Sequence, residues 1–220
     1  MGRLTDFLVN RLLRERLGCR LKWMIRYEQD LRIPVPCPPL KIPLTIREVK
    51  EEDLPAFLSF VAPDLLPELR QELRQGHLCV GAFDQDRAVG YTWANPNQVY
   101  EISTGLQSPL KPHEVYTYRK LVDPAFRNLG VSARLDWERN RILAAKGFRH
   151  KVSFMDRGNY AARRSSGRAG SRPVRHLIFL QAFGLQLTLS LPMKKAGPGR
   201  RSRAWVRPGR AGPGRPVFFR

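Results

Sequence analysis

The residues with the clearest chemical capacity are those at 122–132, Val-Asp-Pro-Ala-Phe-Arg-Asn-Leu-Gly-Val-Ser. They lie between an apolar, strand-like segment and a stretch with helical spacing. The first amides of a helix have no partner within the helix, and the helix dipole adds positive charge there, so such a turn attracts anions. Gly130 lets the backbone approach a phosphate closely, and Arg127 adds a full charge with paired donors. The segment is therefore predicted to bind a pyrophosphate.

Two common nucleotide-binding patterns do not fit this segment. It has no Gly-Lys-Ser/Thr, as in the loop that binds nucleoside triphosphates, and no G-x-G-x-x-G, as in dinucleotide-binding folds. The segment instead resembles the acetyl-CoA motif of the GNAT acetyltransferases, V-x-P-x-x-[QR]-x-x-G-x-[GA]. Val122, Pro124, Arg127 and Gly130 match this motif, and Ser132 replaces its last small residue.

A second stretch is similar to the same family. A predicted strand at 151–155 is followed by a predicted helix at 159–169, where the family pattern is N-x-x-A-x-x-x-[YF]-x-x-x-G-F. Asn159, Ala162 and Gly170 stand at matching positions, whereas Ser166 and Ser171 occupy the two aromatic ones. Arginines crowd this region, where they could bind the 3′-phosphate of CoA or an anionic acceptor, or form a solvated basic face. They are Arg157, Arg163, Arg164, Arg168, Arg172 and Arg175.

The resemblance implies that acetyl-CoA is the acyl donor and that an amine attacks the thioester directly. It implies that strands 114–122 and 151–155 run parallel and splay apart around the pantetheine arm, to which Leu121 and Val122 would offer backbone groups. The expected cofactor-binding residues are Leu121, Val122, Arg127, Asn128, Leu129, Gly130, Val131, Ser132 and Asn159.

The catalytic groups are less clearly indicated. An alkylamine with a pKa near ~10.4 is mostly protonated at pH 7, so a carboxylate acting through water is expected, and Glu101 and Glu114 are candidates. Family members commonly place a proton-donating tyrosine where this chain has Ser166, and Tyr160 is nearby in sequence. The predicted catalytic residues are Glu114, Ser166 and Tyr160. Because Ser166 replaces the tyrosine, an alternative is a non-catalytic CoA-binding, polyanion-binding or membrane-associated module with the same fold.

The pattern of hydrophobic residues predicts an α/β (α+β) fold, a GNAT-like mixed central sheet of about six to seven strands flanked by helices. Strands are predicted at 45–49, 78–83, 88–93, 114–122 and 151–155, and on either side of Gly184 within 174–191. Helices are predicted at 51–62, 64–75, 129–146 and 159–169.

Extensions are predicted on both sides of this domain, which is placed at 44–192. Residues 1–32 are interpreted as a basic helical extension, because 4–17 has apolar residues with a period near 3.6. That helix could lie on an anionic membrane through residues 1–27 or cover its own domain. Five prolines at 33–43 predict a stiff linker, and 193–220 is a low-complexity basic tail. Arginines and aromatic residues in this tail could contact nucleic acid.

The net charge, the Cys and His content and the apolar segments limit which partners, metal sites and locations are expected. The formal charge is +20, and 194–220 holds nine Lys or Arg and no acid, so polyanions are the expected partners. Three cysteines and four histidines without close pairing argue against a metal site and favour free thiols in a reducing cytoplasm. Neither a secretory signal nor a 20-residue apolar span is present, so the predicted location is cytoplasmic, including the inner membrane surface. No motif indicates the acceptor or the oligomeric state.

Overall fold

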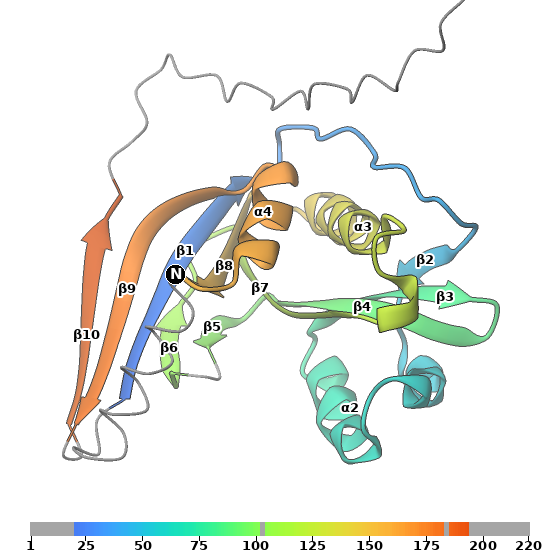
Figure 1. The fold of residues 1–220 in the computed structure, drawn as a ribbon, viewed down its shortest axis with the longest axis horizontal. Coiled ribbons are helices and arrows are strands. Elements are labelled where there is room, and N and C mark those ends of the chain that lie inside the picture. The colour runs from blue at the N-terminus through green and yellow to red at the C-terminus, as the bar shows by residue number, and fades with distance from the viewer. Residues whose placement is uncertain (1–19, 102–103, 183–184, 194–220) are drawn as a thin grey trace, which may run out of the picture.

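The centre of the molecule is an eight-stranded sheet in the order β10-β9-β1-β8-β7-β4-β3-β2 (Figure 1). The computed structural model describes residues 20–101, 104–182 and 185–193. Neighbouring strands are antiparallel except for β7 and β8, which are parallel. The predicted mixed α/β fold is confirmed, with more strands than expected. The sheet contains β1 (Arg20–Asp30), β2 (Thr45–Glu48), β3 (Leu78–Asp84), β4 (Arg87–Asn95), β7 (Glu114–Val122), β8 (His150–Asp156), β9 (Arg172–Ala182) and β10 (Leu185–Pro192).

Helices cover both faces of the sheet (Figure 1). On one face lie α3 (Val131–Ala145) and α4 (Tyr160–Arg168), and on the other lie η1 (Glu51–Ser59) and α2 (Leu66–Arg74). Two short 3-10 turns complete the set, η2 (Pro63–Leu65) and η3 (Pro124–Phe126). The helix predicted at 51–62 is a 3-10 helix over Glu51–Ser59, and it contains Pro55, whose ring disfavours the interior of an α-helix.

Alternating residues of the central strands are buried on opposite faces of the sheet. In β3, Val80 and Ala82 face the cluster under α3, which includes Leu135. Cys79 and Phe83 face the cluster under η1 and α2. Because side chains alternate along a strand, this double burial requires a continuous apolar run rather than an amphipathic one. A separate hairpin of β5 (Gln98–Glu101) and β6 (Leu106–Pro109), which the sequence did not predict, precedes β7.

The prediction of a helical extension over residues 1–32 is wrong for residues 20–30. These residues form β1, which lies inside the sheet and pairs with β8 on one side and β9 on the other. Met24, Ile25 and Tyr27 are buried, so both faces of the strand contribute to the core. Since the backbone of 20–27 is paired on both edges, it is not available for a membrane surface. The helix expected at 4–17 lies outside the described residues.

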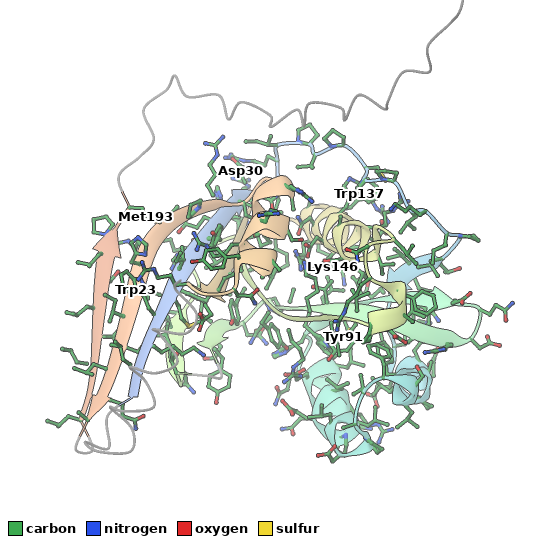
Figure 2. All side chains as sticks on the ribbon, viewed as in Figure 1. Trp23, Asp30, Tyr91, Trp137, Lys146 and Met193 are labelled. Carbon is green, nitrogen blue, oxygen red and sulfur yellow. The ribbon has the colours of Figure 1, made fainter. Side chains whose placement is uncertain are left out.

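The proline-rich segment 33–43 is not a free linker between two units. It runs from β1 across α3 to β2 (Figure 1) and contacts α3 on the way. The Trp137 indole, labelled in Figure 2, donates to the Val35 carbonyl at 2.9 Å, and Arg134 donates to the Pro38 carbonyl at 3.4 Å. Prolines lack amide donors but keep their carbonyl acceptors, and side chains of α3 use those acceptors.

Two remaining predictions concern the ends of the chain and membranes. The tail at 193–220 lies outside the described residues, apart from Met193. Within the described ranges, no helix is both long enough and apolar enough to cross a bilayer.

Candidate functional site

A cavity of about 1430 Å³ lies on the face of the sheet that carries α3 and α4. Its walls are the C-terminal end of β7, one side of α3, one side of α4, the end of β1 and the segment 33–41. Ligand pockets commonly measure roughly 300–1,000 Å³, so this cavity is large enough for an extended, nucleotide-sized ligand.

The turn that leads from β7 into α3 is held in place by its own contacts. The buried Asp123 carboxylate accepts hydrogen bonds from the Ala125 amide at 2.9 Å and from Arg87 at 2.6 Å. Asn128 and Gly130 have φ angles of 65° and 89°, which turn the chain sharply before the helix begins. A Cβ atom added to Gly130 would lie 2.4 Å from the carbonyl oxygen of Pro39. Glycine is therefore required here both by its conformation and by the lack of space.

The first turn of α3 carries amides without acceptors. Arg134 makes the first hydrogen bond of the helix, to the Gly130 carbonyl at 3.1 Å. The amides of Val131, Ser132 and Ala133 have no acceptor among residues 20–101, 104–182 and 185–193. Val131 and Ser132 line the cavity. The cavity thus receives the positive end of the helix dipole together with unused N–H donors.

The charged side chains that line the cavity are all cationic. No Asp or Glu among the described residues lines it. Lys120 and Arg141 are paired with Asp136 and Glu138, whereas the other four make no ion pair within the described ranges. The cationic lining consists of Lys41, Lys120, Arg127, Arg141, Arg164 and Arg168. A cavity with this positive lining favours a polyanionic ligand.

The strands β7 and β8 diverge beside the cavity. They pair in parallel only from Glu114 opposite His150 to Tyr116 opposite Val152. Further along, β7 keeps its partner β4, although Arg119, with φ of 38°, forms a bulge in that ladder. The edge of β7 that faces β8 therefore has no strand partner over its last residues. The prediction of parallel strands that splay apart is confirmed.

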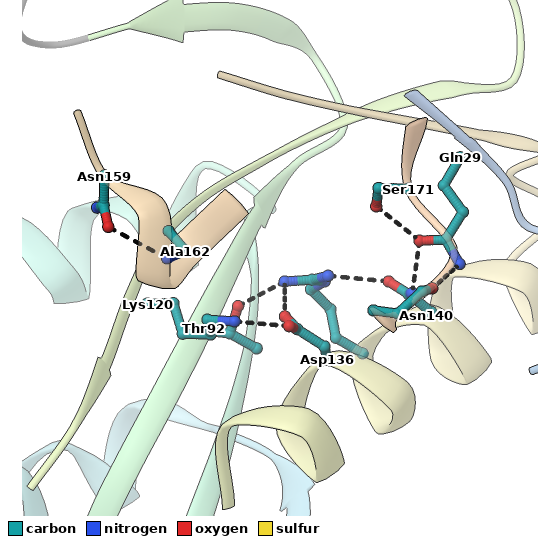
Figure 3. A network of polar contacts seen from close by, with 10 residues as sticks. Gln29, Thr92, Lys120, Asp136, Asn140, Asn159, Ala162 and Ser171 are labelled. Atoms are coloured by element: carbon teal, nitrogen blue, oxygen red, sulfur yellow. Dashed lines mark hydrogen bonds and ion pairs between the residues drawn. The ribbon is translucent and has the colours of Figure 1, made fainter. Parts of the chain in front are cut away.

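A buried ion network joins α3 to the sheet beneath the cavity (Figure 3). Asp136 is 2.6 Å from Lys120 Nζ and 3.0 Å from an Arg139 nitrogen, and Arg139 also donates to the Thr92 hydroxyl at 2.6 Å. Burial alone would raise the pKa of Asp136, but the positive charges of Lys120, Arg139 and Lys151 hold it at about 2. Burial, aided by the charge of Arg139, lowers the pKa of Lys151 to about 7.

Amide side chains extend this network toward α4 (Figure 3). Arg139 donates to Asn140 at 2.9 Å, and Asn140 donates to Gln29 of β1 at 3.3 Å. Gln29 in turn donates to the Ala169 carbonyl at 2.7 Å and accepts from Ser171 at 3.1 Å. The network ties α3, β1 and the end of α4 together, so it fixes the spacing of three cavity walls.

The predicted cofactor-binding residues largely come together at this cavity. Eight of the nine line it: Leu121, Val122, Arg127, Asn128, Gly130, Val131, Ser132 and Asn159. The exception is Leu129, whose side chain packs against the core under α3 while its carbonyl accepts from the Lys41 amide at 3.1 Å. Asn159 also caps α4, since its side chain accepts from the Ala162 amide at 3.1 Å.

The predicted base, Glu114, lies away from the cavity. It is the first residue of β7, at the opposite end of the strand from Val122, and only 9% of it is exposed. Its carboxylate accepts from the Lys111 amide at 3.0 Å and lies 3.6 Å from Arg26. These contacts give Glu114 a structural role. The side chain of the other candidate, Glu101, lies outside the described residues.

The two predicted hydroxyl donors are placed differently. Ser166 is buried on the inner side of α4 and does not line the cavity, whereas its neighbour Ser165 does. Tyr160 lines the cavity and is 58% exposed, with the Arg163 guanidinium 5.4 Å from its ring centre. A helix rotates by about 100° per residue, so adjacent serines point in different directions.

Several residues that line the cavity carry no signal in the local sequence. Lys41, Trp137 and the prolines of 33–39 reach the cavity through contacts between distant segments, and no local pattern marks them. Lys120 could have been found, because strand alternation places it on the same side of β7 as Val122.

No group of three or more His, Cys, Asp or Glu side chains within the described ranges is arranged to hold a metal ion.

The family comparison agrees with the motif in the β7–α3 turn. The profile of the Acetyltransferase (GNAT) family matches residues 46–165, more than half of the chain. A comparison with curated protein sequences found no match.

Solved structures give the same fold at low sequence identity. A GNAT-family protein from Novosphingobium aromaticivorans DSM 12444 is 18% identical, with a TM-score of 0.52, over 75% of this chain and 68% of that one. A GCN5-related N-acetyltransferase from Sphaerobacter thermophilus is 17% identical, with a TM-score of 0.51, over 80% and 57%. A tandem GNAT protein from the clavulanic acid biosynthesis pathway is 13% identical, with a TM-score of 0.52, over 78% and 57%.

Proposed function

Because this chain belongs to the GNAT acetyltransferase family, we propose that its cavity binds acetyl-CoA and that the protein transfers the acetyl group to an amine. The observation that carries the proposal is the charge of the cavity, which is lined by six Lys or Arg and by no described acid. CoA carries a pyrophosphate and a 3′-phosphate, and both are anions that such a lining favours.

The start of α3 is the proposed pyrophosphate site. The free amides of Val131 and Ser132 supply N–H donors, and Arg127 adds a charge that can hold two phosphate oxygens. Arg164 and Arg168, one turn apart on α4, are the proposed partners of the 3′-phosphate. Both line the same cavity as the α3 turn.

The pantetheine arm is proposed to lie along the open edge of β7. Between Thr117 and Val122, this edge has no partner in β8, so its peptide groups are available to the amides of pantetheine. The thioester would then reach the point of divergence. There, a backbone amide can stabilise the oxyanion that forms when the amine attacks.

The transfer forms a bond between the amine nitrogen and the acetyl carbon and breaks the bond from that carbon to sulfur. The ammonium form of the acceptor first loses a proton, and the departing CoA thiolate takes one up. We propose Tyr160 as the donor to the thiolate, because it is the only one of the three predicted catalytic residues that lines the cavity. Glu114 and Ser166 would act on stability rather than on transfer.

Binding and transfer need separate tests. Titration calorimetry should show that the full chain binds acetyl-CoA, that Arg127→Glu weakens binding by at least about tenfold, and that Arg149→Glu does not. Arg149→Glu makes the same change of charge at an exposed residue outside the cavity. If the wild-type protein does not bind acetyl-CoA at millimolar concentration, the cofactor proposal fails.

A non-catalytic CoA-binding module is the second candidate. It is favoured by one observation, the lack of a carboxylate base among the described residues that line the cavity. Release of CoA thiol in the presence of a library of primary amines separates the two. Thiol release with any amine supports the transferase, whereas tight binding without release across the library supports the module.

A further inference from the structure

The Ser153 hydroxyl is buried and has no hydrogen-bond partner among the residues that the structure describes. Two other buried side-chain atoms share that condition there, Trp93 Nε1 and Arg139 Nε. Trp93 packs in the cluster under η1 and α2, on the face away from the cavity. Arg139 still donates from its other two nitrogens, to Thr92 and Asn140. An unpaired hydroxyl inside a protein costs folding free energy, so the one of Ser153 calls for an explanation.

Ser153 stands where β7 and β8 part. The last pair of the parallel ladder joins Tyr116 with Val152, so Ser153 is the next residue of β8. On the β7 side, the Thr117 hydroxyl donates to the Val152 carbonyl at 3.4 Å, so this hydroxyl is used within the protein. On its other edge, β8 remains paired with β1, where Tyr27 is opposite Ser153. Ser153 is thus held in the sheet by β1 and borders the gap that opens between β7 and β8.

The side chain of Ser153 points to the face of the sheet that carries the cavity. Side chains alternate along a strand, so Ser153 shares its side with Lys151. Lys151 lies beneath α3, where its positive charge helps to lower the pKa of Asp136. Phe154, the next residue of β8, lies on the other face and packs against Tyr116, with 5.8 Å between the ring centres. The hydroxyl is therefore on the side from which acetyl-CoA is proposed to bind.

Burial limits what can reach this hydroxyl. Ser153 is 6% exposed and is not among the residues that line the cavity, so it lies behind the cavity wall. A ligand reaches it only with an end that enters the gap between β7 and β8. In the proposed binding mode, the pantetheine arm follows β7 to the point of divergence, and the acetyl thioester is the end of that arm. The thioester carbonyl accepts hydrogen bonds, and the serine hydroxyl has one to donate.

We propose that the Ser153 hydroxyl donates a hydrogen bond to the carbonyl oxygen of the bound acetyl thioester and is a catalytic residue of the transfer. This inference rests on the proposed function. When the amine nitrogen attacks, an electron pair of the carbonyl bond moves onto the oxygen, and the hydrogen bond strengthens as the negative charge grows. The carbonyl forms again when the carbon–sulfur bond breaks and sulfur takes the bonding pair. The proton stays on Ser153 Oγ throughout, so Tyr160 remains the proposed donor to the thiolate.

The carbonyl signal of bound acetyl-CoA tests this contact without turnover. In carbon-13 NMR of the full chain with acetyl-CoA labelled at the carbonyl carbon, binding to the wild type should move the signal downfield, because a donor on the oxygen withdraws charge from the carbon. Ser153→Ala should bind with nearly the same affinity and show a clearly smaller shift. The matched control is Ser166→Ala, a buried serine of α4 that does not line the cavity, and it should keep the full shift. Equal shifts in the wild type and Ser153→Ala overturn the inference, whereas a wild type that does not bind acetyl-CoA overturns the proposed function instead.

Kinetics and stability separate this role from a structural one. Ser153→Ala should lower kcat by about a hundredfold, as the loss of one oxyanion donor does, with little change in the KM for acetyl-CoA. Its unfolding free energy in urea should stay the same or rise, because the lost hydroxyl has no partner in the described part of the free protein. A lower unfolding free energy together with an unchanged kcat would mean that the hydroxyl serves the fold, and the inference would be wrong.

Discussion

Replacing Gly130 with alanine tests whether the α3 turn and the proline-rich segment work as one unit. Gly130 has φ of 89°, and its missing Cβ would lie 2.4 Å from the Pro39 carbonyl oxygen. Gly147, at the other end of α3, has nearly the same φ, 90°, but an added Cβ there meets no atom within 4 Å. Both alanine variants therefore place a side chain on a left-handed backbone, but only Gly130→Ala also creates a steric clash.

The shared cost is the left-handed backbone, which disfavours a residue with a side chain by about 1–2 kcal/mol. Only Gly130→Ala must also move Pro39 by roughly 1 Å, the shortfall from ordinary van der Waals contact. That movement strains the hydrogen bond from the Lys41 amide to the Leu129 carbonyl, and such a bond contributes about 1 kcal/mol. We expect a loss of unfolding free energy of about 2–4 kcal/mol for Gly130→Ala and about 1–2 kcal/mol for Gly147→Ala.

Urea unfolding measures the two losses, and calorimetry with acetyl-CoA measures binding. Gly130→Ala should weaken acetyl-CoA binding by at least about tenfold, or 1.4 kcal/mol, because the start of α3 shifts, whereas Gly147→Ala should retain it. The reasoning is refuted if the two variants lose the same stability and bind acetyl-CoA equally well.

Three further changes test separate parts of the site. Arg164→Gln with Arg168→Gln should weaken binding of acetyl-CoA by about tenfold and of its 3′-dephospho form by much less, as titration calorimetry would measure. Tyr160→Phe should lower kcat while keeping acetyl-CoA affinity, whereas Ser166→Ala should change the unfolding free energy and leave kcat unchanged, as steady-state assays and urea unfolding would show. For Lys151, the folded pKa of about 7 lies below the ordinary 10.5, so between these values the unfolded chain binds more protons and stability rises with pH. Compared with Lys151→Met, the wild type should therefore gain about 1 kcal/mol per pH unit from pH 7 to 9 in urea unfolding.

For each of these three predictions, one result would refute the reasoning. Equal losses for the two CoA forms would place the 3′-phosphate elsewhere in the cavity. An unchanged kcat in Tyr160→Phe would exclude this hydroxyl as the proton donor. Unfolding free energies of the wild type and Lys151→Met that change in parallel with pH would mean that Lys151 is not desolvated in the fold.

The turn that we propose as the anion site was predictable because the residues that shape it are close together in the sequence. The turn brings together a strand end, Pro124, Arg127 and Gly130 within a few residues. The glycine is needed for a backbone with positive φ, and a glycine between a strand and a helix suggests this conformation from the sequence alone. Among the predicted catalytic residues, Ser166 lies in the core, whereas its neighbour Ser165 lines the cavity, so a shift of one residue along α4 decides which of the two is reached. Periodicity does not fix the rotation of a nine-residue helix that closely.

The central position of β1 was not predictable from its neighbourhood in the sequence. Its apolar residues occur on both sides of the strand, and the prolines that follow it suggested a boundary. Its partners, β8 and β9, come late in the chain, so only pairing between distant segments defines the strand. The wall formed by 33–41 likewise depends on contacts between segments that are distant in the sequence. The proline-rich segment crosses α3 and accepts a hydrogen bond from Trp137 of that helix.

The position of β1 inside the sheet also limits how early the protein can fold during its synthesis on the ribosome. Its residues are synthesised early, yet the pairs it forms join positions from 120 apart, Asp30 with His150, to 161 apart, Arg20 with Gln181. Contacts between such distant residues slow folding, because a long loop must close before any pairing is gained. Until β9 emerges, β1 presents an open edge that can pair with another chain. Yield during expression should therefore depend on temperature and on chaperones more than the stability of the finished fold suggests.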